Sequence, residues 1–371
     1  MPTPFRIATP QPDLDDLRRR LHATRWPEPA PVDGWAQGVP LAYLKGLISY
    51  WADGHDWRAT EARVNRIPQV MVHVDGLDIH ALHLRSGRPG AVPVVLTHGW
   101  PGSFFEYEAV LAPLADAGFD VVAPSLPGYG FSGKPTTPGW DIHRIARAWA
   151  DLMTALGYPR FIASGSDWGT SISTSLALQR PERLLGIHLV PPLVAPIRDD
   201  DPPPGEAAAL ADLADRERDG SGYSVLHATR PQTIGYSLVD SPAGLCAWIV
   251  EKIWSWADHA DDLSTVLTDD QVLDDVTLYW LTGSGASSAR LYAESIGEVS
   301  RWFTAETADT VRVPTGCTVF PKEVPRPSRR WARRRFPHIV HWGEPARGGH
   351  FGAWEQPALF VEELTTFAGR L

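Results

Sequence analysis

The fold is decided by the stretch RFIASGSDWGT, residues 160–170. It begins with a strand pattern at Arg160–Ser164, and a helical pattern follows at Thr170–Gln179. Between the two patterns, glycines stand two places before and two places after Asp167, at Gly165 and Gly169. This spacing is typical of a nucleophile elbow, a sharp turn from a strand into a helix that presents a reactive side chain at its tip. The stretch therefore predicts that Asp167 is a nucleophile.

Two other interpretations of this turn have to be weighed. Centring the elbow on Ser166 would put Trp168 at a crowded position, which disfavours a serine nucleophile. Alternatively, Asp167 only caps the helix that follows, a role that aspartate often has. The choice depends on the residues that surround the turn.

Strands and helices alternate on both sides of the elbow. Before it, the pattern predicts a hairpin, two buried strands and a helix, at Val70–Val74, Leu77–Leu84, Val92–Leu96, Asp120–Pro124 and Ile142–Leu156. After it, the pattern predicts three strands and a closing helix, at Leu184–Val190, Thr315–Phe320, His338–Trp342 and Pro357–Leu371. Such alternation is the signature of a mostly parallel, doubly wound sheet. With the elbow, it predicts an α/β protein with the α/β-hydrolase fold.

Two helical regions interrupt or precede this core. Residues 1–68 carry helical patterns and are expected to form an appendage to the core. After Pro191 an acidic, proline-rich stretch leads into tryptophan-rich helical sequence, which is expected to form a lid. The predicted division is an appendage, a first core segment, a lid and a second core segment, at residues 1–68, 69–191, 192–303 and 304–371.

Composition excludes several classes of protein. The chain has 371 residues and a formal net charge of −10, which argues against nucleic acid or an anionic membrane as a partner. Its two cysteines, Cys246 and Cys317, allow no disulfide framework or multi-cysteine metal site, and they fit a reducing compartment. Neither a signal peptide nor a long apolar segment is apparent, so we expect a cytoplasmic protein without a membrane anchor. The arginine-rich run at 329–335 is interpreted as a solvated helical face.

The segment Thr97–Gly102 directly follows a buried strand. From this position the α/β-hydrolase fold donates a backbone N–H group to an oxyanion, which predicts Trp100 as one donor. The second donor would be the N–H of Trp168, the residue after the proposed nucleophile. A plainer interpretation is a tight Gly-Trp-Pro-Gly turn, but the elbow downstream favours an oxyanion hole.

A base and an acid are expected beyond the last two strands. His350, in Gly-Gly-His-Phe, follows the final strand, where the fold places its histidine. The acid should follow the preceding strand, which indicates Glu323. Glu344 is nearer in sequence but lies at the end of the histidine's own strand, so it ranks second.

An aspartate nucleophile restricts the reaction. A carboxylate displaces a leaving group at saturated carbon and gives an ester intermediate, so strained epoxides and alkyl halides are the natural electrophiles. His350 would then activate water against the ester carbonyl, and the oxyanion hole would stabilise the tetrahedral charge. Neither a metal nor an organic cofactor is expected.

With these residues in place, the chain resembles the microsomal-type epoxide hydrolases, which include the insect juvenile hormone epoxide hydrolases and soluble bacterial relatives. The resemblance runs almost from end to end and is carried by short motifs. They are Tyr43–Lys45, Ile67–Gln69, His98–Ser103, Pro127–Ser132, Ser166–Gly169, Ser221–Tyr223, Asp240–Leu245, Ser288–Tyr292, Phe320–Glu323 and Arg347–Phe351.

The resemblance implies that Asp167 is the nucleophile, that Glu323 and His350 complete the charge relay, and that two lid tyrosines, Tyr223 and Tyr292, protonate the epoxide oxygen. From the residues alone these tyrosines could equally be packing residues of the lid. No apolar anchor is found before the appendage, which favours a soluble member of the family.

The leading hypothesis is therefore an epoxide hydrolase that forms a vicinal diol with water as its only co-substrate. A haloalkane dehalogenase is second, and a catalytically silent binding module of the same fold is third. Tryptophans in the lid suggest a bulky apolar or aryl epoxide, but tryptophan is also ordinary helix-packing material; they are Trp248, Trp254, Trp256 and Trp280. A homodimer is left open.

Overall fold

One sheet lies at the centre of the computed structural model, which describes residues 2–304 and 309–371. Within the described chain its nine strands have the order β1-β2-β3-β5-β4-β6-β7-β8-β9. They are β1 (Thr3–Phe5), β2 (Gln69–Val74), β3 (Leu77–Leu84), β4 (Val92–Thr97), β5 (Phe119–Pro124), β6 (Phe161–Ser166), β7 (Leu184–Val190), β8 (Thr315–Thr318) and β9 (Ile339–Gly343). The pairs β1–β2, β2–β3 and β3–β5 are antiparallel, and all pairs from β5 to β9 are parallel. The predicted mostly parallel α/β sheet is confirmed.

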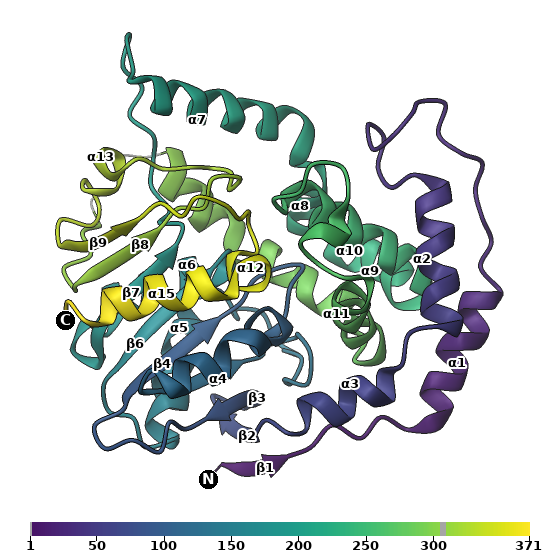
Figure 1. The fold of residues 1–371 in the computed structure, drawn as a ribbon, viewed down its shortest axis with the longest axis horizontal. Helices are drawn as coiled ribbons and strands as arrows, with labels where there is room; N and C mark the ends of the chain where they lie inside the picture. The colour runs from purple at the N-terminus through teal and green to yellow at the C-terminus, as the bar shows by residue number, and fades with distance from the viewer. Residues whose placement is uncertain (1, 305–308) are drawn as a thin grey trace.

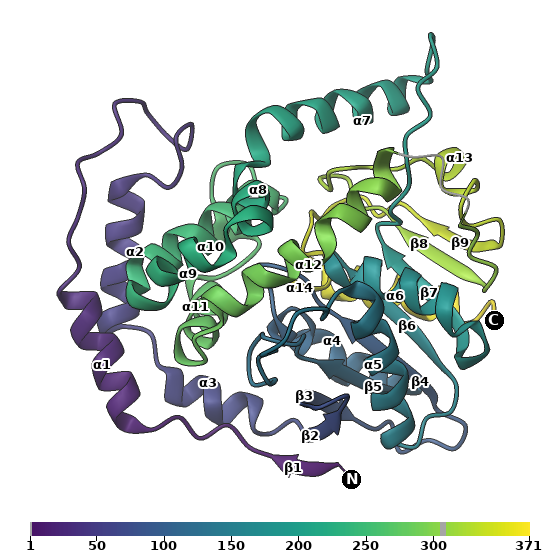
Figure 2. The ribbon, with the colours of Figure 1, turned by 180° about the vertical axis from the view of Figure 1, so that it is seen from behind.

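Helices cover both faces of this sheet. Figure 1 shows α4 (Glu108–Asp116) and α15 (Pro357–Ala368) in front of it, and Figure 2 shows α5 (Ile142–Ala155) and α6 (Trp168–Gln179) on the other side. Strands that are covered on both faces need apolar side chains on both, and β6 is buried along its whole length. Two short helices, α13 (Arg329–Ala332) and α14 (Gly352–Glu355), complete the core.

The chain leaves the sheet after β7 and returns to it at β8. The helices of this insertion are α7 (Pro204–Asp215), α8 (Gly222–Thr229), α9 (Pro231–Asp240), α10 (Pro242–Trp256), α11 (Asp269–Leu281) and α12 (Ser284–Thr304). Figure 1 shows α8 to α11 gathered to one side of the sheet and α7 across the top of the view. The start of the predicted second core segment, 304–371, includes residues 305–308, which lie outside the described chain. The four-part division of the chain stays a prediction.

The first 68 residues pack on the insertion and also reach the sheet. Helices α1 (Gln11–His22) and α2 (Leu41–Asp53) contact α10, and α3 (Trp57–Val64) contacts α11. Strand β1 pairs with β2 at the edge of the sheet, which the helical interpretation of this region did not predict. Three residues are too short to show the alternation by which a strand is recognised in a sequence.

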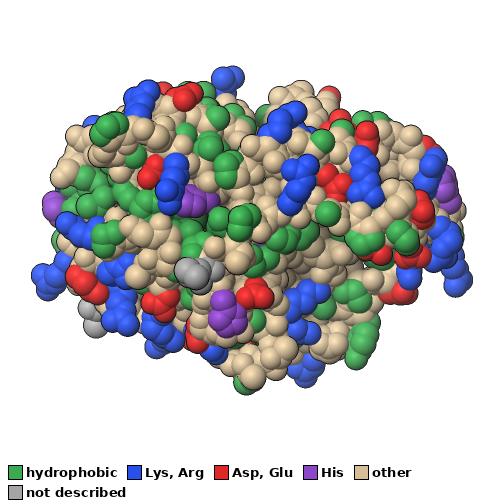
Figure 3. Space-filling model, turned by 90° about the horizontal axis from the view of Figure 1, so that it is seen from below, with side chains coloured by type: hydrophobic (Ala, Val, Ile, Leu, Met, Phe, Trp, Pro, Cys, Tyr) green, Lys and Arg blue, Asp and Glu red, His purple; other side chains and the backbone are tan. Residues whose placement is uncertain are grey.

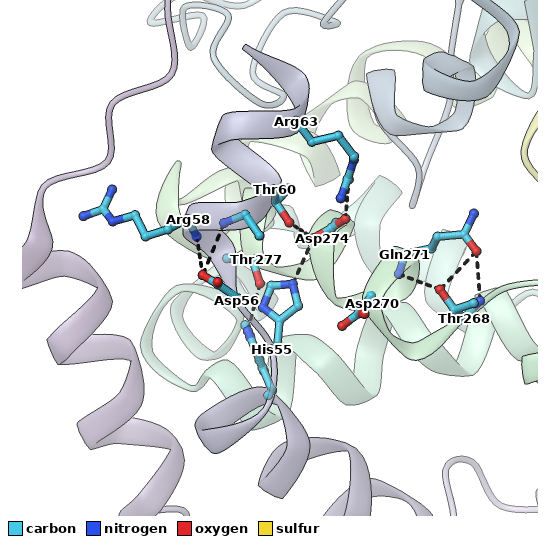
Figure 4. Close-up of polar contacts among 12 residues, drawn as sticks. His55, Asp56, Arg58, Thr60, Arg63, Thr268, Asp270, Gln271, Asp274 and Thr277 are labelled. Atoms are coloured by element: carbon cyan, nitrogen blue, oxygen red, sulfur yellow. Dashed lines mark hydrogen bonds and ion pairs between the residues drawn. The ribbon is translucent and has the colours of Figure 1, made fainter. Parts of the chain in front are cut away.

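A buried carboxylate joins these parts at the position that Figure 4 shows. Asp274 of α11 is 2% exposed and accepts a hydrogen bond of 2.6 Å from the Thr60 hydroxyl. His55 Nε2 lies 2.8 Å from its Oδ1, and Arg63 Nη2 lies 2.6 Å from its Oδ2. Arg63 also binds Glu108 of α4 at 2.7 Å. One lid helix is thereby tied to both the appendage and the core.

The arginine-rich run at 329–335 is not a uniformly solvated face, so that interpretation is wrong for its last member. Arg335 is 3% exposed, and its guanidinium lies 3.9 Å from the ring centre of Trp302. Elsewhere, basic and acidic side chains are interspersed over the face that Figure 3 shows. Within the described chain, no helix combines the length and the apolar character that crossing a bilayer would require.

Candidate active site

Asp167 is the single residue between β6 and α6. Its backbone has φ 49° and ψ −120°, a conformation that costs energy for any residue other than glycine. A Cβ on Gly165 would lie 2.1 Å from the carbonyl carbon of Gly169, and a Cβ on Gly169 would lie 1.9 Å from the carbonyl oxygen of Thr97. Only glycine fits these two places. The side chain of Asp167 makes no capping hydrogen bond to α6, so the helix-cap interpretation is wrong.

A backbone N–H group holds one oxygen of the Asp167 carboxylate. The N–H of Trp100 donates to Oδ1 at 2.9 Å, and the N–H of Trp168, the first residue of α6, lies near the carboxylate and acts to lower its pKa. A Cβ on Gly99 would lie 2.1 Å from Oδ1, so a glycine is needed for this close approach. Burial raises the pKa of Asp167, while the His350 charge and the two N–H groups act to lower it; the net direction is upward.

His350 lies between the two carboxylates of the site. Its Nδ1 is 3.0 Å from Glu323 Oε1 and 3.1 Å from Oε2, and its Nε2 is 3.7 Å from Asp167 Oδ2. Burial lowers the pKa of His350, but the charges of Glu323 and Asp167 outweigh burial and raise this pKa to about 9. The rival acid, Glu344, is exposed and accepts a hydrogen bond from Trp342. The loops after β8 and β9 therefore bring Glu323 and His350 together and leave Glu344 outside.

The two lid tyrosines lie against the two tryptophans whose N–H groups lie near the Asp167 carboxylate. The ring of Tyr223, in α8, stacks at 5.0 Å on that of Trp100, and the ring of Tyr292, in α12, packs edge-on at 4.8 Å against that of Trp168. The tyrosine rings are 5.7 Å apart, and each phenol influences the pKa of the other. Burial raises the pKa of both phenols above the ordinary value, so both are protonated near neutral pH.

A cavity of about 730 Å³ opens over these groups. Asp167, His350, Tyr223 and Tyr292 all line it. Much of the remaining wall is apolar and comes from the chain after β7, from α7 and from α12: Pro191, Leu193, Ala195, Pro196, Ile197, Leu213, Ile296, Val299 and Phe303. Its size is in the range of pockets that enclose small organic ligands.

Most of the lid tryptophans that suggested an apolar or aryl epoxide pack away from the nucleophile. Trp254 stacks on Trp35 of the appendage at 4.3 Å, Trp248 donates to His227, and Trp280 meets Arg20. Trp256 does reach the triad, with its ring 4.9 Å from that of His350. Tryptophan is large enough to serve helix packing as well as ligand contact, and sequence alone does not separate these uses.

Two charged residues near the site were not predicted. Arg216, between α7 and α8, lines the cavity. Glu106 is fully buried, which raises its pKa, and its carboxylate lies 3.5 Å from the hydroxyl of Ser166 beneath the elbow. In the sequence, Arg216 is one charge among many in an acidic segment, and Glu106 looks like an acidic residue at the start of a helix. No pattern distinguishes them.

Comparisons with known proteins agree with this geometry. The family model of the epoxide hydrolase N terminus matches residues 2–107, and that of the alpha/beta hydrolase fold matches residues 92–224. A candidate epoxide hydrolase of Stigmatella aurantiaca is 49% identical over 98% of this chain and 83% of its own length. The chain belongs to the epoxide hydrolase family.

Further relatives place the chain within this family. Epoxide hydrolase 1 of Sus scrofa is 33% identical over 99% of this chain and 88% of its own length. The structure of an enantioselective mutant of the Aspergillus niger epoxide hydrolase superimposes with a TM-score of 0.92 at 31% identity, covering 100% of this chain and 97% of that one. The juvenile hormone epoxide hydrolase of Bombyx mori gives a TM-score of 0.85 at 30% identity, with coverage of 100% and 93%. The resemblance drawn from the sequence motifs is confirmed.

Proposed function

We propose that this member of the epoxide hydrolase family opens an apolar epoxide to a vicinal diol through a covalent ester on Asp167. One observation carries the proposal. Oδ1 of the Asp167 carboxylate accepts a hydrogen bond from the Trp100 N–H, and Oδ2 lies 3.7 Å from Nε2 of His350. A carboxylate held in this way has one oxygen left for attack. Two protonated phenols lie in the same cavity, where an epoxide oxygen could accept their hydrogen bonds.

Ester formation would proceed by attack of Asp167 Oδ2 on an epoxide carbon. The carbon–oxygen bond of the ring breaks, and the electron pair goes to the epoxide oxygen. Tyr223 and Tyr292 would donate to that oxygen, and one of them would give up its proton to form the alcohol. The release of ring strain and this protonation make a modest nucleophile sufficient.

Ester hydrolysis would use His350 as the base for water. While Asp167 is ionised, its charge helps to keep His350 protonated. Esterification removes that charge, so the pKa of His350 falls and the imidazole can lose its proton to the phenolate formed in the first step. Neutral His350 then takes a proton from water as the water attacks the ester carbonyl, and Oδ1 carries the tetrahedral charge on the Trp100 and Trp168 N–H groups.

The apolar wall of the cavity supports an apolar epoxide as the substrate. Asp167, Glu323, His350 and the two tyrosines account for each step with water as the only co-substrate. The paired phenols favour an epoxide over an alkyl halide, because a departing halide needs hydrogen-bond donors but no proton.

The test is hydrolysis of styrene oxide by the wild type and by Asp167→Ala, with thermal unfolding as the check on folding. A single turnover of the wild type in ¹⁸O-water should place the label in the peptide that contains Asp167, because water attacks the carbonyl of the ester. Loss of diol formation in Asp167→Ala, together with this label, is the expected result. Activity that survives in the variant would refute the nucleophile, and halide release from a haloalkane without activity on epoxides would indicate a dehalogenase.

A further inference from the structure

An arginine that the proposed mechanism does not use reaches into the same cavity. Arg216 is the first residue of a π-helical turn, Arg216–Gly220, between α7 and α8. Its guanidinium lies 5.4 Å from the ring centre of Trp256, and that ring lies against His350. Turns of this kind are rare and often occur at functional sites.

The charge of Arg216 is not taken up by a close carboxylate. Within the described residues, no Asp or Glu oxygen lies within 4 Å of its guanidinium, whereas the neighbouring Arg218 pairs with both Asp215 and Asp219. A partly buried guanidinium without an ion-pair partner is costly to retain for stability alone. Its charge interacts instead with the phenol of Tyr223, whose ring lies 5.4 Å from that of Trp256.

We propose that Arg216 is a positioning residue for ring opening, which acts through Tyr223 and makes this tyrosine, rather than Tyr292, the proton donor to the epoxide oxygen. The inference rests on the proposed function. Arg216 would donate to the Tyr223 oxygen, and Tyr223 in turn would donate to the epoxide. When the proton moves, it goes to the epoxide oxygen, which has taken the electron pair of the broken C–O bond. The phenolate left on Tyr223 keeps the guanidinium of Arg216 as its counter-ion.

The surroundings of the two tyrosines differ in the direction that this role needs. Burial and the charge of Asp167 raise the pKa of Tyr223, and although Arg216 and Tyr292 act to lower it, the net direction is upward. Burial also raises the pKa of Tyr292, and its contacts with Tyr223 and Asp167 raise it further. The titratable and charged groups around Tyr223 are Asp167, Arg216, His227, Lys252 and Tyr292.

Lys252 is the other cation near Tyr223, but it is placed differently. Its Nζ lies 4.9 Å from the centre of the Tyr223 ring, over the face of the ring, and forms an ion pair of 2.6 Å with Glu251. A cation over the ring face does not hydrogen-bond to the phenol oxygen. Arg216 is therefore the cation that can stabilise a charge on that oxygen.

The experiment measures ester formation by stopped-flow fluorescence in single turnovers with styrene oxide. Arg216→Met should slow ester formation about 10- to 100-fold, which lies at or below the lower end of the range of about 10²- to 10⁴-fold for proton transfer by a side chain, because Arg216 acts through Tyr223. Arg216→Lys should recover most of the rate, because it keeps a cation. Arg218→Met, which removes an exposed arginine two residues away, is the matched control and should leave the rate unchanged.

A double-mutant cycle separates an effect through Tyr223 from a structural one. In a Tyr223→Phe background, Arg216→Met should change ester formation less than about threefold, whereas in a Tyr292→Phe background it should keep its full effect. Equal effects in both backgrounds, or an unchanged rate in Arg216→Met, would overturn the inference. An effect on KM alone would also overturn it, since it would assign Arg216 to substrate binding. Failure of the Asp167 labelling experiment would instead remove the proposed function itself.

Discussion

Replacing Glu323 by glutamine tests the electrostatic coupling at the centre of the site. Burial lowers the pKa of His350, yet the charges of Glu323 and Asp167 raise it from 6.5 to about 9, with Glu323 as the larger influence. A tenfold change in protonation is about 1.4 kcal/mol, so this rise corresponds to roughly 3 kcal/mol in favour of the imidazolium. Glutamine has nearly the same size and still accepts a hydrogen bond from Nδ1, but it removes the charge.

We expect Glu323→Gln to form the ester and to hydrolyse it about 10²- to 10⁴-fold more slowly, the range for loss of general-base catalysis. Water activation creates an imidazolium, which would then lack its carboxylate partner. Because the pKa of His350 falls, the rise of the hydrolysis rate with pH should also move to lower pH. Stopped-flow tryptophan fluorescence gives both rates, since Trp100 and Trp168 lie beside the nucleophile, and the mass of the intact protein shows the accumulated ester.

Glu344→Gln is the matched control, because this carboxylate is exposed and lies in the neighbouring loop. It should leave ester formation and hydrolysis unchanged. The reasoning would be refuted if Glu323→Gln hydrolysed the ester at the wild-type rate, or if both substitutions slowed hydrolysis equally.

Three further results are expected. Arg63→Met should lower the free energy of unfolding by about 1–3 kcal/mol in a denaturant titration, because it leaves Oδ2 of the buried Asp274 without its arginine partner, whereas Arg18→Met, at an exposed ion pair, should change it by less than about 1 kcal/mol. Gly169→Ala should slow ester formation by about tenfold or more, since its Cβ would lie 1.9 Å from a carbonyl oxygen of β4 and the elbow must shift; an unchanged rate would contradict this. Ester formation in the wild type should fall as the pH falls through the raised pKa of Asp167, because only the carboxylate attacks, and a rate that stays constant down to pH 4 would count against burial as the cause.

The sequence located the parts of the candidate site that follow a strand. Asp167 comes directly after β6, and Glu323 and His350 lie in the loops that follow β8 and β9, and strand ends can be located from apolar patterns. The elbow glycines could also be predicted, because a sharp turn excludes side chains at known spacings. Boundaries were less certain: β6 runs to Ser166 and α6 begins at Trp168, so the turn is tighter than the predicted ends indicated.

The lid was much harder to predict, because its residues meet the site through packing between helices far apart in the sequence. Tyr223 and Tyr292 came only from the resemblance to a family, and nothing in their own neighbourhoods marks them. Arg216 and Trp256 face the site from two different helical segments, and only the folded chain shows which face of each segment points inward. A residue that follows a strand of this sheet lies at a known edge of the sheet. The direction in which a helix residue points depends instead on the elements that the helix packs against.

The charges in the cavity suggest why a cation belongs beside the tyrosines. In the resting site two carboxylates, Asp167 and Glu323, face two cations, His350 and Arg216. In the proposed ring opening the negative charge leaves Asp167, which becomes an ester, and appears on Tyr223. The total charge of the site is unchanged by this step. Arg216 interacts with both Asp167 and Tyr223, so a negative charge lies near its guanidinium before and after ring opening. A site that is already polarised for the charge it will receive needs little reorganisation during the reaction, and this is the property that the arginine would contribute.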